Sequence, residues 1–287
     1  MLIACFVGAT GASAGEVERV VANGMELAYV ETGRGAPVVL VHGGLQDYRL
    51  WRAHLGVFGQ RYRAIAYSRR NHFPNAVSAD DTSDTMGDVH GDDLAGLIER
   101  LALGRVHVVA HSGGALAALF FAANHPELIR TLTVNEPPAT GLLLNAAGGA
   151  EALAEFGARM TPAREAFRVG DLQRGLRLFA DAVGGPGTYD RRSDAERRMM
   201  MDNALERVAD ARASSQAPAF TCEMAKRITA PTLLMNGARS PAIFHRIADQ
   251  LERCLPNRER VVVPDTSHTV PSENPKGFDD AVLAFLA

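Results

Sequence analysis

The feature that most constrains the fold is an alternation of short apolar runs, rich in Val, Ile and Leu, with longer stretches of helical spacing. The runs predict buried strands at residues 37–44, 62–68, 105–110, 129–138, 231–237 and 258–265. Helices are predicted over residues 48–58, 84–103, 114–125, 241–255 and 274–287. This order predicts an α/β fold, in which helices cover both faces of a mostly parallel, twisted sheet.

Two segments depart from this alternation. Residues 16–33 read as two strands around Asn23-Gly24, a strong hairpin turn. Residues 142–217 show no strand pattern, and the stretch from Glu151 to Arg212 holds 11 Arg and 11 Asp plus Glu. Such interleaved charges are typical of the solvated faces of amphipathic helices, so we expect an inserted helical segment there.

The composition limits the classes of partner. The chain has 287 residues, 47% of them hydrophobic and 22% charged, which fits one large globular domain. The formal net charge of −3 carries no basic excess that would indicate nucleic acid or an anionic membrane. No apolar run reaches the roughly 18 residues of a membrane-spanning helix. We therefore expect a small-molecule partner, with a homodimer left open.

The N-terminal residues 1–19 resemble a signal peptide or a disordered tail. An apolar stretch is followed by A-S-A at Ala12 to Ala14, but the positive charge that begins a signal peptide is missing. The protein would be exported, periplasmic or secreted, if this is a truncated signal, and cytoplasmic otherwise. The favoured interpretation of the three cysteines is as small buried residues, with a Cys222–Cys254 bridge as the alternative for an exported protein.

The stretch VVAHSGGALAALFF, residues 108–121, places Ser112 on a sharp boundary between a predicted strand and a predicted helix. The small residues Ala110 and Gly114 let the two elements approach closely, so the serine projects from the tip of the turn. Backbone N–H groups at the start of the helix face outward and can bind a developing negative charge. The pattern indicates a nucleophile elbow, and the alternative is that Ser112 only caps the helix.

Two further strand ends fit a serine nucleophile, which needs a base and an oxyanion hole. His268 follows the last predicted strand, downstream of the other candidate residues. Its alternative is a structural or surface histidine. His42-Gly43-Gly44 follows a buried strand, and its glycines allow a backbone N–H to face the site. We assign the oxyanion hole to the N–H groups of Gly44 and Gly113, in preference to a plain glycine turn.

These motifs resemble the α/β-hydrolase superfamily. The resemblance covers about residues 20–287 and rests on VVLVHGG, VVAHSGG, the GARSP region after PTLLMNG, and TSHTVPSENP. It implies a core of residues 20–141 and 218–287 and a helical lid at 142–217. Epoxide hydrolases and haloalkane dehalogenases of this superfamily use an Asp at the elbow, so Ser112 argues against both.

The acid of the triad departs from the usual pattern of the superfamily. In most members it follows the strand matched here by PTLLMNG, but this chain has Ser240 at that place. Some relatives instead carry it after the strand that succeeds the elbow helix, where this chain has Glu136. We therefore expect Glu136 to be the acid, its alternative being a solvent-exposed carboxylate. Asp265, only three residues before His268, is a poorer candidate.

Three residues are candidates for substrate binding. Tyr48 and Trp51, near the oxyanion loop, could line the pocket or pack the first helix, and packing is favoured. His72 lies with Arg69 and Arg70 in YSRRNHFPN, where relatives have an Asp-x-Arg-Gly loop. These three side chains could contact substrate, but fixing that loop by hydrogen bonds is the favoured interpretation.

The sequence thus predicts a serine hydrolase that cleaves a carboxylic ester or lactone through an acyl-enzyme. Ser112 would be the nucleophile, His268 the base and Glu136 the acid, with no metal or organic cofactor. The alternatives are a cofactor-free perhydrolase or a C–C bond hydrolase with the same triad, and a non-catalytic ligand receptor on the same fold.

Overall fold

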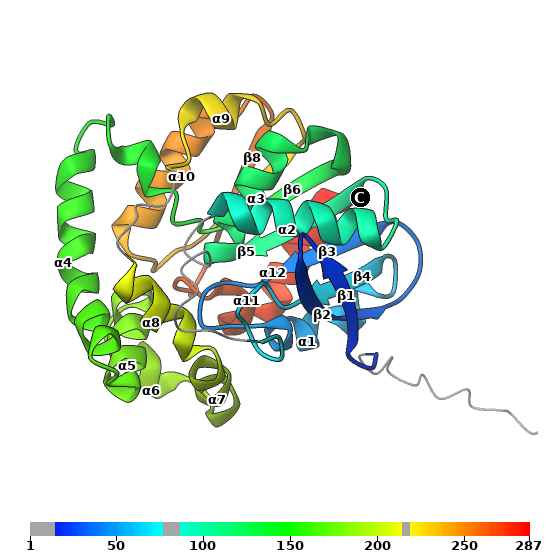
Figure 1. Ribbon diagram of the computed structural model, residues 1–287. Helices are drawn as coiled ribbons and strands as arrows, with labels where there is room; N and C mark the ends of the chain where they lie inside the picture. Colours follow the sequence, from blue (N-terminus) through cyan, green and yellow to red (C-terminus); the bar gives the residue numbers. More distant parts are fainter. Residues whose placement is uncertain (1–14, 77–86, 214–218) are drawn as a thin grey trace, which may run out of the picture.

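The computed structural model describes residues 15–76, 87–213 and 219–287. Its described strands form one sheet in the order β1-β2-β4-β3-β5-β6-β7-β8 (Figure 1). The pairs from β4 through β3 to β8 are parallel, and the hairpin of β1 and β2 joins β4 in antiparallel fashion. The strands are β1 Glu18–Ala22, β2 Met25–Thr32, β3 Pro37–Val41, β4 Arg63–Tyr67, β5 Val106–His111, β6 Ile129–Asn135, β7 Thr232–Gly237 and β8 Arg258–Val263.

The predicted strands and hairpin are therefore confirmed, and so is the α/β-hydrolase fold class. The central strand β5 is buried along its whole length, because a parallel strand covered on both faces needs apolar residues at successive positions. The hairpin turns at Asn23-Gly24, where both residues have positive φ.

Helices cover both faces of the sheet. Residues of α2, α3 and α10 pack into one apolar cluster, and residues of α1 and α12 into a second cluster on the other face (Figure 1). The core helices are α1 Arg52–Phe58, α2 Gly87–Arg100, α3 Ser112–Asn124, α9 Cys222–Lys226, α10 Ala242–Cys254, α11 Val270–Glu273 and α12 Pro275–Leu286. The helix predicted over 48–58 begins with a 3₁₀ turn, Tyr48–Trp51, which the Asp47 side chain caps.

Residues 142–217 are mostly helical where the structure describes them, as predicted. Their helices form a separate group beside the sheet: α4 Gly149–Arg168, α5 Leu172–Gly184, α6 Thr188–Arg191, α7 Asp194–Asp202 and α8 Ala204–Arg212 (Figure 1). Phe167, Leu176 and Met200 belong to a cluster of their own, which Leu45 joins from the core. The predicted end of the insertion, residue 217, lies outside the described residues, as does most of the signal-like segment 1–19.

One expectation about the cysteines is wrong. Cys222 and Cys254 form a disulfide, with their Cα atoms 5.3 Å apart, instead of lying unpaired as favoured. The first residue of α9 and the last residue of α10 meet because these two helices pack together. A separation of 32 residues carries no local signal of such a contact. Cys5 lies outside the described residues.

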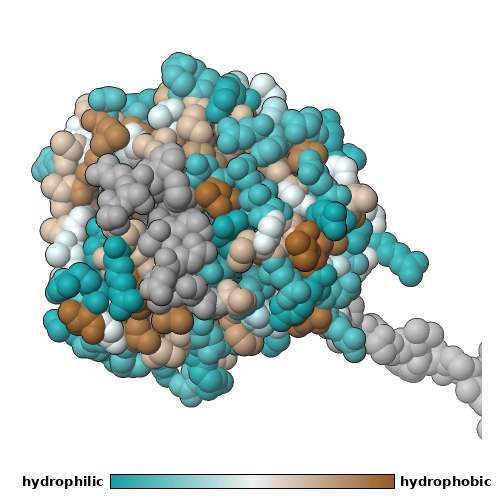
Figure 2. Space-filling model, viewed as in Figure 1, coloured by the Kyte–Doolittle hydropathy of each residue, from teal (hydrophilic) through white to brown (hydrophobic). Residues whose placement is uncertain are grey.

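The surface is mixed. On the face shown in Figure 2, hydrophobic residues lie singly or in small groups among hydrophilic ones. That face gives no support to the homodimer left open above. Among the described helices, none combines the length and apolarity that crossing a bilayer requires.

Candidate active site

Ser112 occupies a strained turn between β5 and α3. Its φ is +51°, a conformation that side-chain-bearing residues rarely adopt. The glycines around it are required by contact: a Cβ on Gly114 would lie 2.2 Å from the His42 carbonyl oxygen, and one on Gly43 would lie 2.9 Å from Ser112 Cβ. The turn therefore brings strand and helix together closely and projects the serine, as the elbow pattern predicts.

Three of the predicted site residues lie in one hydrogen-bonded row. Ser112 Oγ is 2.8 Å from His268 Nε2. On the other side of the ring, His268 Nδ1 is 2.7 Å from Glu136 Oε2. The Glu136 side chain is fully buried. In such a row a histidine and a carboxylate can activate a serine hydroxyl.

Glu136 reaches this position from the tip of β6, which neighbours the nucleophile strand β5. Its φ is +50°, and its Oε1 accepts the Gly237 N–H at 2.8 Å, so a bond from the tip of β7 fixes the carboxylate. The competing positions are placed differently. Ser240 Oγ is buried and has no hydrogen-bond partner within the described part of the chain, and Asp265 is exposed.

The His268 ring is held from two sides. Phe244 stacks on it, with ring centroids 4.2 Å apart and an interplanar angle of 24°. The centroid of the His111 ring lies 5.0 Å from that of His268, and His111 Nδ1 is hydrogen-bonded to Asn135 Oδ1 at 2.8 Å. Burial holds the pKa of His111 well below its usual value, and the nearby charges of His268 and Arg192 act in the same direction. His111 is therefore neutral, and the ring nitrogen that contacts Ser112 Oγ belongs to His268.

Gly44 and Gly113, the candidate oxyanion donors, lie close together beside Ser112. A Cβ built on Gly113 would lie 3.6 Å from the Gly44 nitrogen. On either side of Gly44, the Gly43 N–H donates to Gln46 Oε1 at 2.9 Å and the Leu45 N–H donates to Glu206 Oε2 at 2.7 Å. Gly113 is the second residue of α3, where helix N–H groups have no partner within the helix. The geometry suits an oxyanion hole made from these two groups.

The pocket beside Ser112 and His268 is walled largely by the helical insertion, which sequence reasoning did not resolve to residues. The insertion contributes the apolar wall and two charged side chains, namely Phe179, Ala180, Val183, Met199, Met200, Arg192 and Glu196. Arg192 donates to Thr269 Oγ1 at 3.2 Å, next to the catalytic-site histidine. No local sequence motif identifies these residues, because they come from separate helices and meet only in the folded protein.

The predicted substrate-binding residues lie elsewhere. Tyr48 and Trp51 are buried, and both pack in the cluster on the α1 and α12 face. His72 is fully buried, and its Nδ1 donates a hydrogen bond to the Arg70 carbonyl oxygen at 2.7 Å. None of the three belongs to the pocket beside Ser112. The alternatives favoured above, packing for the two aromatic residues and loop fixation for His72, match these positions. Within the described ranges, no three His, Cys, Asp or Glu side chains gather as a metal site would require.

Comparisons with known proteins agree with this architecture. The chain is 25% identical over 262 residues to 2-(acetamidomethylene)succinate hydrolase of Mesorhizobium japonicum, covering 89% of this chain and 90% of that protein. A thermophilic esterase from Thermogutta terrifontis superposes with a TM-score of 0.72 at 24% identity, covering 95% and 98% of the two chains. The enol-lactonase from Burkholderia xenovorans superposes with a TM-score of 0.73 at 17% identity, covering 94% of this chain and 99% of that chain.

A family model matches most of the chain as well. It describes the alpha/beta hydrolase fold and spans residues 36–275, from the start of β3 to the beginning of α12. That span includes the elbow, the helical insertion and the candidate histidine. The chain therefore belongs to the alpha/beta hydrolase fold family.

Proposed function

We propose that this protein is a serine hydrolase that cleaves a carboxylic ester or a lactone through an acyl-enzyme. The observation that carries the proposal is the row from Ser112 Oγ through His268 to Glu136, with contacts of 2.8 and 2.7 Å. The row ends in a fully buried carboxylate that has a second bond from Gly237, so the imidazole is held in one orientation.

The first half-reaction forms the acyl-enzyme. Ser112 Oγ attacks the carbonyl carbon while His268 Nε2 takes its proton, and the carbonyl oxygen becomes an oxyanion that the Gly44 and Gly113 N–H groups bind. The bond to the leaving alkoxide then breaks, and His268 gives it the proton. Glu136 keeps the other imidazole proton on Nδ1 and stabilises the imidazolium.

The second half-reaction restores the enzyme. Water gives its proton to His268 and attacks the acyl carbon. The tetrahedral intermediate collapses, the bond to Ser112 Oγ breaks, and His268 returns the proton to the serine. The products are the carboxylic acid and the alcohol, or a single hydroxy acid when the substrate is a lactone. Every step uses side chains and backbone N–H groups of this chain, the substrate and water.

We further propose that residues 142–217 act as a lid over a core of residues 20–141 and 218–287. The support for this is the contribution of α5 and α7 to the wall beside Ser112, through Phe179, Val183, Met199 and Met200. An apolar wall of this kind favours an apolar acyl or alcohol group. The names of the similar proteins, an esterase, a lactonase and a succinate-derivative hydrolase, support hydrolysis at a carbonyl carbon.

The test is a panel of p-nitrophenyl esters of increasing chain length together with several lactones. We expect turnover of at least one class and a loss of roughly a thousandfold or more in kcat for Ser112→Ala. Ser240→Ala is the matched control, a buried serine near β7 outside the row, and it should keep activity within tenfold. Equal activity of wild type and Ser112→Ala would refute the proposal. An absence of turnover on every ester and lactone of the panel would leave C–C bond hydrolysis or perhydrolysis as the chemistry of the same triad.

A further inference from the structure

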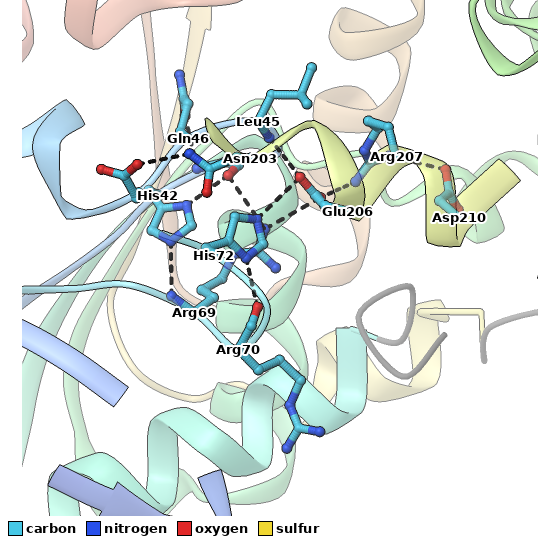
Figure 3. Close-up of polar contacts among 12 residues, drawn as sticks. His42, Leu45, Gln46, Arg69, Arg70, His72, Asn203, Glu206, Arg207 and Asp210 are labelled. Carbon is cyan, nitrogen blue, oxygen red and sulfur yellow. Dashed lines mark hydrogen bonds and ion pairs between the residues drawn. The ribbon is translucent and has the colours of Figure 1, made fainter. Parts of the chain in front are cut away.

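Glu206 is a buried carboxylate at the boundary between the helical insertion and the core. Glu206 lies on α8, where Figure 3 shows its contacts with the core. Its side chain is only 2% exposed. Its Oε2 accepts the N–H of Leu45 at 2.7 Å and lies 3.1 Å from His72 Nε2. The expectation that the charges of the insertion lie on solvated helix faces is therefore wrong for this residue.

Glu206 is ionised in this environment. Burial alone would raise the pKa of its carboxyl, but Arg207, His72 and Arg69 outweigh burial and hold the pKa well below its usual value. Arg69 Nη2 lies 3.7 Å from Oε1, and Arg207 contacts the same oxygen. Packing alone does not explain the cluster, because well-packed apolar residues often stabilise a core as much as a buried ion pair does. Its position against Gly44 and Leu45, which line the pocket beside Ser112, indicates a role in that site.

The same carboxylate adjoins Gly44, one of the two proposed oxyanion donors. A Cβ built on Gly44 would lie 3.2 Å from Glu206 Oε1. The next residue, Leu45, has a φ of +58°, which is costly for a side chain of this kind. The insertion holds Leu45 in this conformation twice, through the bond from its N–H to Glu206 and through its side chain in the Phe167 and Leu176 cluster.

Because peptide units are planar, fixing the Leu45 N–H fixes the plane of the Gly44–Leu45 peptide. The Gly43 N–H is fixed in turn by Gln46. The Gly44 N–H lies in the Gly43–Gly44 peptide, whose carbonyl oxygen accepts a hydrogen bond from His42 Nδ1 at 2.7 Å, and this peptide has an anchored peptide on either side. Without the carboxylate, Leu45 would keep only its side-chain contacts in the cluster, and we expect the Gly44–Leu45 peptide to turn and the Gly44 N–H to shift.

Asn203, one helical turn before Glu206, holds α8 in place. Its Nδ2 donates to Asp47 Oδ2 at 2.8 Å, and its Oδ1 accepts the Phe73 N–H at 2.8 Å. The start of α8 is thus tied to the loop after β3 and to the loop after β4. The docking contacts of Asn203 and the bond from Leu45 to Glu206 thus lie on one helical turn at the start of α8.

We propose that Glu206 is a positioning residue for the oxyanion hole, so that the site is complete only while α8 is docked. The inference rests on the proposed function, since it concerns the Gly44 N–H of that mechanism. Arg69 and Arg207 compensate the charge of Glu206, which would otherwise repel the oxyanion that forms nearby. The insertion therefore supplies part of the catalytic geometry as well as the wall of the pocket.

The experiment compares Glu206→Ala and Glu206→Gln with the control Asp210→Asn. Asp210 lies four residues further along α8 and pairs with Arg207 at 3.1 Å, but not with the Leu45 loop. Each variant is assayed on a p-nitrophenyl ester and on the corresponding thiono ester, at matched folded fraction. Sulfur is a weaker hydrogen-bond acceptor than oxygen, so a well-placed Gly44 N–H favours the oxygen ester.

For Glu206→Ala we expect kcat on the oxygen ester to fall roughly a hundredfold, with KM within about threefold, and the oxygen-to-thiono rate ratio to fall with it. Glu206→Gln, which keeps an acceptor for the Leu45 N–H, should lose only about tenfold, and Asp210→Asn should match wild type.

The proposal is overturned if both Glu206 variants keep the wild-type rate ratio and kcat. It is also overturned if the rate ratio stays unchanged while kcat falls, because the carboxylate then acts only on overall structure. If Glu206→Ala fails to fold, Glu206→Gln decides by the same criteria. A wild-type protein without Ser112-dependent turnover would instead refute the proposed function, and this inference with it.

Discussion

Replacing Glu136 with glutamine keeps the shape of the side chain and removes its charge. The Gly237 N–H donates to Oε1 at 2.8 Å, so the amide oxygen should keep that position. The amide NH₂ then faces His268 Nδ1, where a carboxylate oxygen lies at 2.7 Å in the native protein. A donor at that place favours the tautomer with its proton on Nε2, facing Ser112, and such an imidazole cannot accept the serine proton.

The size of the effect follows from the same distance. Opposite unit charges 2.7 Å apart attract by about 6 kcal/mol at an effective dielectric constant of about 20. An amide that still makes one neutral hydrogen bond keeps about 1 kcal/mol of this. A loss of about 5 kcal/mol in the transition state lowers kcat by roughly 10³–10⁴-fold, which agrees with the loss seen when a triad carboxylate is neutralised.

The assay is kcat on the best p-nitrophenyl ester for Glu136→Gln and Ser240→Ala, with folded fractions matched by circular dichroism. We expect Ser240→Ala to change kcat by less than about tenfold, since a hydroxyl brings no charge to the imidazolium. A larger loss of kcat in Ser240→Ala than in Glu136→Gln would refute the reasoning and show that Glu136 is not the acid.

Two further predictions concern stability. Cys254→Ala opens a loop whose ends are separated by 32 residues, so we expect the free energy of unfolding in urea to fall by about 3–4 kcal/mol. A reductant should then have no further effect on the variant. An unchanged urea midpoint would show that the Cys222–Cys254 bond does not stabilise the fold. Burial holds the pKa of His42 and of His111 well below about 6.5, so the unfolded chain binds protons that the folded chain excludes, and stability should fall as pH drops below about 6.5, by up to about 1.4 kcal/mol per pH unit for each histidine. Equal urea midpoints at pH 8 and pH 5.5 would contradict this assignment.

The strand ends were predictable from the sequence because parallel strands bring their carboxyl ends to one edge of the sheet. Ser112, Glu136 and His268 each follow a recognisable apolar run, and the structure brings these three side chains together. The placement of Glu136 also depends on the order of strands, since β6 lies between β5 and β7.

The contacts across the insertion could not be predicted. Glu206 meets Leu45 across 161 residues, and a glutamate within an amphipathic helix reads as solvent-exposed in any local pattern. The expectation that Cys222 and Cys254 are unpaired was wrong for the same reason, because their disulfide depends on how α9 packs against α10. Tyr48 and Trp51 were candidates for the pocket because they are near the oxyanion loop in sequence, yet both turn into the core.

The central claim is that Ser112 carries the acyl group. The most direct measurement is labelling of the native protein with a fluorophosphonate, followed by intact-mass analysis and mapping of the modified peptide. We expect one adduct per chain on the peptide that contains Ser112, none on Ser112→Ala, and labelling at close to the native rate on Ser240→Ala. An unlabelled protein, or an adduct on another residue that persists in Ser112→Ala, would contradict the account.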